Sequence, residues 1–222
     1  MRWTVPSFVI PVALALLILG VPRFISSLLK APAHATLTQV EAGKLPPPDQ
    51  LDRAAKHLEK VRPWESSAEL SAEIGSLRLL QAFQMDETDP DRVSVAGLAT
   101  ANLMESLRLS PARPHPWVRL AYAKDMTGAT NSEITSLLEH SSAVGPFVGE
   151  ISLVRLKLLL KKWDSLSPDM RRYTFKQVRY MWVHDENFVI RAARQTSRPY
   201  LIRFALRPVS GALDRFDRAV PR

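Results

Sequence analysis

The chain has 222 residues, of which 46% are hydrophobic and 23% are charged, a balance typical of a folded protein rather than a disordered one. It contains no cysteine, which excludes disulfides, thiol catalysis and cysteine-based zinc sites. Its 8 glycines and 17 prolines separate apolar runs in the manner of a helical protein, and they argue against an all-β fold. We therefore expect an all-α fold.

The net charge of +8 is distributed unevenly along the chain. Residues 31–149 hold 11 basic and 15 acidic side chains, whereas residues 150–222 hold 16 basic and 7 acidic ones. The excess of basic side chains indicates that the C-terminal third faces something anionic. The alternative is a solvated, arginine-rich surface without a partner, and composition alone does not separate the two.

An uncharged apolar segment covers residues 3–22. About 20 residues at about 1.5 Å each span the roughly 30 Å hydrocarbon core of a bilayer, so the segment predicts a transmembrane helix. Arg2 and Trp3 at one end and Arg23 at the other are typical interfacial anchors. A cleaved signal peptide is the alternative, but the small-x-small sequence at 33–35 lies far beyond the apolar segment, which favours an uncleaved anchor.

The orientation of this membrane anchor, residues 1–30, follows from its flanks. Basic residues lie at both ends, so the positive-inside count is nearly balanced. Insertion with a short cytoplasmic N-terminus is the simpler topology for a signal anchor. In a bacterium we therefore expect a single-pass inner-membrane protein whose residues 31–222 lie in the periplasm.

Residues 31–48 are rich in alanine, threonine and proline. The three consecutive prolines at their end favour a stiff, extended linker that lifts the following region off the membrane. Apolar residues at helical spacing then predict three helices, with Asp49 and Ser66 as the expected N-terminal caps of the first two. These helices are expected over about 49–62, 65–85 and 92–109.

The stretch LSPARPHPWVRLAYA, residues 109–123, places three prolines before a helical pattern. Pro111 is followed six residues later by Trp117 and then by Leu120-Ala121, which is the spacing found between successive tetratricopeptide-like repeats. We therefore interpret residues 49–146 as a helical repeat region of the tetratricopeptide-like type.

The remaining helices are marked by capping signals. Thr130 with Glu133 predicts the start of the partner helix in that repeat. Ser167 before Pro168 predicts a helix start within the basic C-terminal helical region, residues 147–222, which we expect to pack on the repeats. Shorter helices are expected near 185–195 and within 199–219.

The residue patterns favour no catalytic or metal centre. Ser27 and Lys30 fit the Ser-x-x-Lys form of serine acyl enzymes, but the companion motifs of those enzymes are missing. His184, Asp185 and Glu186 point in three directions on a helix, so they do not converge on a metal ion. We expect no catalytic residue, no metal, no cofactor and no nucleic-acid partner.

The arginine-rich segment RPYLIRFALRPVSGALDRFDR, residues 198–218, predicts an interaction surface. We expect Arg203 and Arg207 on one helix face, and Tyr200, Leu201 and Phe204 towards another. Such a helix suits an anionic membrane surface or an acidic polysaccharide, or else it simply closes the repeat stack with solvated arginines. The interaction candidates of the whole chain are Trp117, Arg119, Tyr122, Arg155, Trp182, Arg203 and Arg207.

The anchor, the stretch LRLSPARPHPWVRLA and the later segment LLLKKWDSLSPDMRRYTFKQVRYMW together resemble a known family. Over most of residues 50–195 the chain is similar to the small membrane-anchored, repeat-like accessory proteins of exopolysaccharide and O-antigen synthesis systems, the VpsP type. The resemblance implies an accessory role in assembling or exporting an envelope polysaccharide together with proteins of that machinery, and it supplies no catalytic residue. The alternative is an anchored polysaccharide hydrolase or lyase with an unrecognised site.

Overall fold

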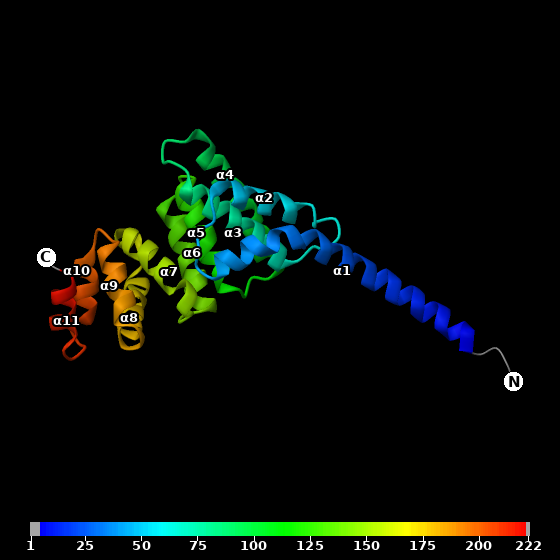
Figure 1. Ribbon diagram of the computed structural model, residues 1–222. Coiled ribbons are helices and arrows are strands. Elements are labelled where there is room, and N and C mark those ends of the chain that lie inside the picture. The colour runs from blue at the N-terminus through cyan, green and yellow to red at the C-terminus, as the bar shows by residue number, and fades with distance from the viewer. Residues whose placement is uncertain (1–4, 221–222) are drawn as a thin grey trace. The chain divides into compact units, whose positions relative to one another are not determined.

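The computed structural model describes residues 5–220, so the predicted interfacial anchors Arg2 and Trp3 lie outside the described residues. Within that range every regular element is a helix, as expected, and none is a strand (Figure 1). The chain forms two compact units, Met1–Pro111 and Ala112–Arg222, which we call unit 1 and unit 2. The division between the two units therefore follows Pro111.

Unit 1 is built from four successive helices that pack in chain order, each on the next. Its core gathers apolar side chains from the first three of them, including Ala33, Leu51, Leu58, Ile74 and Leu77. The four helices are α1 (Val5–Glu41), α2 (Pro48–Glu59), α3 (Ala68–Gln84) and α4 (Pro90–Leu109).

Helix α1 has two parts with different surroundings. Most of its described apolar side chains before residue 25 are exposed, among them Leu16, Leu17 and Phe24. From Ser26 onward one face is buried, and Ala33 belongs to the core of unit 1. By length and apolar composition α1 can cross a membrane, and only 6% of its most apolar window is buried.

The predicted extended linker over residues 31–48 is wrong for most of its length, because α1 continues to Glu41. The buried packing of Ala33 stabilises the helix there, and Pro32 is accommodated inside it. Only a short turn and an extended segment, residues 42–47, separate α1 from α2. The apolar part of α1 therefore continues without a break into the part that packs in the core of unit 1.

Some predicted helix starts agree with the observed ones, and the others differ by one or two residues. Asp49 lies inside the first turn of α2 and does not cap it. Ser67, and not Ser66, caps α3. Thr130 and Ser167 cap α6 (Asn131–Val144) and α8 (Pro168–His184) as predicted, each accepting a hydrogen bond from a backbone N–H three residues later.

Unit 2 contains two connected cores. One core joins α5, α6, α7 and the start of α8, and the other joins α7 and α8 to the three last helices. Because α7 and α8 contribute to both cores, the short C-terminal helices are fixed on the preceding ones. The elements are α5 (Pro114–Met126), α6 (Asn131–Val144), α7 (Gly149–Lys161), the 3₁₀ turn η1 (Trp163–Ser165), α8 (Pro168–His184), α9 (Glu186–Arg194), α10 (Pro199–Leu206) and α11 (Ala212–Ala219).

Candidate functional site

Three elements of unit 2 line an open hollow of about 440 Å³, within the range of small-ligand pockets. Helix α10 is short, and its buried residues Leu201, Ala205 and Leu206 fix it in the second core. This packing brings the exposed side of α10 next to η1 and α8. The lining of this aromatic–arginine hollow consists of Trp163, Phe175, Tyr200, Leu201, Arg203, Phe204 and Arg207.

Aromatic rings form a continuous surface along the hollow. The ring centres of Trp163 and Phe175 are 5.0 Å apart, and those of Phe175 and Phe204 are 5.4 Å apart. These spacings are typical of favourable tilted aromatic pairs. Tyr200 is 59% exposed and Phe204 is 48% exposed, so part of this aromatic surface is open to a ligand.

The two arginines of the hollow have different partners. Arg203 donates from Nε and Nη2 to the carboxylate of Asp217, each at 2.8 Å, and these hydrogen bonds raise the pKa of Arg203. The Arg207 guanidinium lies 4.6 Å from the Phe204 ring centre. Arg207 is exposed and has no acidic partner within residues 5–220, so its charge is open to an anion.

The η1 wall of the hollow is held by arginines outside it. Arg198 makes a bidentate ion pair with Asp164, at 3.1 and 2.6 Å, and these hydrogen bonds hold the pKa of that carboxyl below its usual range. The Arg171 guanidinium lies 5.5 Å from the Trp163 ring centre. These contacts fix Trp163 in position beside α10.

The structure brings together two of the predicted interaction residues, Arg203 and Arg207. The expected separation of these arginines from Tyr200 and Phe204 is wrong, because all four line the same hollow. The reason is helical spacing: Tyr200, Arg203, Phe204 and Arg207 are three or four residues apart, so they project from one side of α10, and the C-cap residue Arg207 still has α-helical backbone angles.

Three further candidates lie on α5 and not in the hollow. Trp117 stacks on His140 of α6, with ring centres 4.8 Å apart. The Tyr122 hydroxyl donates to the Val154 carbonyl at 3.0 Å, and burial raises the pKa of Tyr122. Arg119 is half-buried on the same helix. Trp117 and Tyr122 therefore contribute to packing between the helices of unit 2.

Two candidates are not surface residues, which corrects our expectation. Arg155 is 0% exposed, and its Nη1 donates to the carbonyls of Ser141 and Gly145 at 3.2 and 2.8 Å. These carbonyls lie at the C-terminal end of α6, where a cation is favourable. Trp182 is 3% exposed and packs in the second core beside Phe216.

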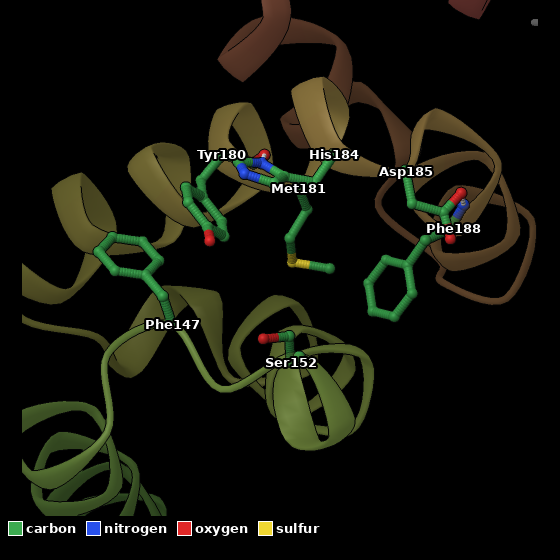
Figure 2. Close-up of a pocket in the computed structure, with 8 residues that line it drawn as sticks. Phe147, Ser152, Tyr180, Met181, His184, Asp185 and Phe188 are labelled. Atoms are coloured by element: carbon green, nitrogen blue, oxygen red, sulfur yellow. Dashed lines mark hydrogen bonds between the residues drawn. The ribbon is translucent and has the colours of Figure 1, made fainter.

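A second pocket of about 310 Å³ lies between the start of α7 and the end of α8 (Figure 2). It contains Ser152, His184 and Asp185, residue types that also occur in hydrolases. The first two bond to backbone carbonyls four residues earlier, at 2.6 and 2.7 Å. Asp185 caps α9 by accepting from a backbone N–H. All three side chains thus have local structural roles.

The sequence patterns do not identify two lining residues of the hollow, Trp163 and Phe175. Trp163 and Phe175 lie on elements distant in sequence from Phe204, and aromatic residues in apolar runs are ordinarily assigned to a core. The clustering of arginine in residues 150–222 was the available signal. Among the described residues, no group of three His, Asp or Glu side chains is placed to hold a metal ion. The sequence matches no protein-family model and no curated protein.

Proposed function

We propose that this chain is a membrane-anchored, non-catalytic accessory protein of envelope polysaccharide synthesis or export, of the VpsP type. The observation that supports this best is the aromatic–arginine hollow, on a chain whose first helix is long and apolar enough to cross a membrane. The anchor keeps the chain where an envelope polymer is assembled, and the hollow offers that polymer a binding surface.

The chemistry of the hollow suits an acidic sugar. The apolar face of a sugar ring carries C–H groups, which stack favourably on the electron-rich face of an aromatic ring. A uronic-acid carboxylate is a good acceptor for the planar guanidinium of Arg207. The hollow is large enough for a short segment of polysaccharide but closes around none of it, as expected for holding a polymer in passage.

Protein partners of the polysaccharide machinery are the second part of the proposal. The spacing from Pro111 to Trp117 and the capped α5–α6 hairpin favour a tetratricopeptide-like surface. Stacked helical hairpins commonly present such surfaces to other proteins. In this proposal the chain crosses the inner membrane once and places residues 31–222 in the periplasm.

A mild-detergent pull-down of the tagged full-length chain, followed by mass spectrometry, tests this proposal. We expect enrichment of a polysaccharide polymerase, glycosyltransferase or export subunit over a tagged single-pass protein expressed at the same level. The absence of any such subunit, after crosslinking as well, would contradict the scaffold role. Saccharide turnover by the purified chain would contradict the non-catalytic assignment.

A further inference from the structure

Helix α1 joins the rest of unit 1 just beyond its uncharged segment. Ser26 and Lys30 lie on α1 shortly after Arg23, which ends the uncharged segment. At about 1.5 Å per residue, they stand about 4 to 11 Å beyond Arg23 along the helix axis. Because α1 is continuous here, any segment that packs on these two residues lies at the edge of a bilayer spanned by α1.

The α2–α3 loop, residues 60–67, is the segment that packs there (Figure 1). The Glu65 carboxylate accepts hydrogen bonds from Ser26 Oγ and, at 2.7 Å, from Lys30 Nζ. It also accepts from Ser67 Oγ at 2.8 Å. The loop is thereby fixed to the anchor helix at the level where the helix leaves the apolar segment.

The same loop is fixed on its other side. Arg62 donates from Nη2 to the side-chain oxygen of Asn102 on α4, and Val61 is fully buried in the core of unit 1. Between these contacts Trp64 is 46% exposed, and its neighbour Pro63 is exposed as well. A large amphipathic ring is therefore held on the outside of the unit, next to the anchor.

Charge distinguishes this end of unit 1 from the opposite end. The exposed basic residues Lys60 and Arg62 precede Trp64 in the loop, and the acidic residue of the loop, Glu65, is paired with Lys30. The opposite end holds the α1–α2 and α3–α4 connections, which lie together because Gln84 donates to the Pro46 carbonyl at 2.8 Å. That end carries one basic residue, Lys44, in these connections and an excess of acidic ones: Glu41, Asp86, Glu87 and Asp89.

We propose that residues 60–64 form a lipid-contacting surface that seats unit 1 on the bilayer spanned by α1, with Trp64 at the level of anionic phospholipid headgroups. Tryptophan favours this interface because its ring is largely apolar while its N–H needs a polar partner. Lys60 and Arg62 are attracted to the negative membrane surface, and the acidic end points away from it. The inference rests on the membrane anchoring in the proposed function.

Nitroxide labels on the full-length chain in vesicles test this surface, and the absence of native cysteine allows one label at a time. The vesicles contain phosphatidylethanolamine and phosphatidylglycerol. Each label reports how accessible its position is to oxygen, which dissolves in the bilayer, relative to a water-soluble nickel chelate. The three labelled positions are Trp64→Cys, Leu17→Cys in the anchor and Leu45→Cys in the α1–α2 connection. We expect the oxygen-to-nickel ratio to be highest at 17, several-fold lower at 64, and lowest, again by several-fold, at 45.

Pro63→Cys provides a second position if Trp64→Cys does not fold. We expect Lys60→Glu, and vesicles of neutral phosphatidylcholine, to lower the ratio at 64 without changing it at 17. A ratio at 64 equal to that at 45, with 17 in lipid, would overturn the lipid-contacting surface and leave the anchor intact. A water-accessible label at 17 would overturn both proposals.

Discussion

The Lys30 ammonium on α1 lies 2.7 Å from the Glu65 carboxylate, and this ion pair joins α1 to the α2–α3 loop. Burial alone would raise the pKa of Glu65, but hydrogen bonds from Lys30, Ser26 and Ser67 hold it below its ordinary value of 4.5. The folded unit thus stabilises the ionised form of Glu65. The strength of the contact between Glu65 and α1 therefore depends on pH.

The first prediction concerns acid stability. Because the folded pKa of Glu65 is below its unfolded value of 4.5, its contribution is present above that pH and is lost as the pH falls through the folded value. Glu65→Gln should therefore lower the free energy of unfolding by about 2 kcal/mol at pH 7. The difference from wild type should shrink as the pH approaches 3, as measured by thermal unfolding in detergent.

Glu87→Gln is the matched control for this prediction, because Glu87 is exposed in the α3–α4 connection. We expect a change within about 0.5 kcal/mol at both pH values. A Glu65→Gln protein as stable as wild type at pH 7 would show that the Lys30–Glu65 pair does not hold α1 on the rest of unit 1.

Close packing of α3 on α4 gives the second prediction. A Cβ atom on Gly75 would lie 2.7 Å from Leu103 Cγ and 3.2 Å from the Leu103 backbone nitrogen, whereas one on Gly97 would meet nothing within 4 Å. Gly75→Ala should therefore destabilise unit 1 by about 1–3 kcal/mol. Gly97→Ala, in the interior of α4, should stabilise it by about 0.5–1 kcal/mol. Equal effects in denaturant unfolding would contradict this helix packing.

The third prediction separates Arg155 from the interaction surface. Arg155→Ala removes a buried side chain and its hydrogen bonds to the α6 carbonyls, so it should lower the free energy of unfolding by about 3 kcal/mol. Arg172→Ala, on the exposed side of α8, should change it by less than about 0.5 kcal/mol. An Arg155→Ala protein that keeps full stability but loses a partner would restore Arg155 as an interaction residue.

These results indicate how far the sequence predicts the fold and the site. Periodicity and caps such as Thr130 and Ser167 predict the helices, because those signals are local. The linker prediction failed because the burial of Ala33 is a tertiary contact that stabilises a proline-containing helix. Arg155 was assigned to the surface because nothing local shows that the α6 carbonyls surround it. The Phe175–Phe204 contact likewise joins distant segments, so the hollow could not be predicted.

The fourth prediction concerns orientation. Leu45 is exposed in unit 1, and the chain has no native cysteine, so Leu45→Cys provides a unique thiol. We expect a membrane-impermeant maleimide to label this thiol in cells whose outer membrane has been permeabilised and whose inner membrane is intact. Labelling that requires lysis of the inner membrane would place unit 1 in the cytoplasm and contradict the periplasmic assignment.

In the proposed function the aromatic–arginine hollow holds an acidic saccharide. The most direct test of this binding is calorimetric titration of the full-length protein with a galacturonic-acid oligosaccharide, using a neutral maltooligosaccharide of equal length for comparison. We expect binding of the acidic oligosaccharide alone, weakened about tenfold by Arg207→Gln, because one charge-assisted hydrogen bond contributes about 1.5 kcal/mol. Arg172→Gln removes the same charge outside the hollow and should leave the affinity unchanged. Equal weakening by both variants, or no binding of the acidic oligosaccharide, would show that the hollow does not bind an acidic saccharide through Arg207.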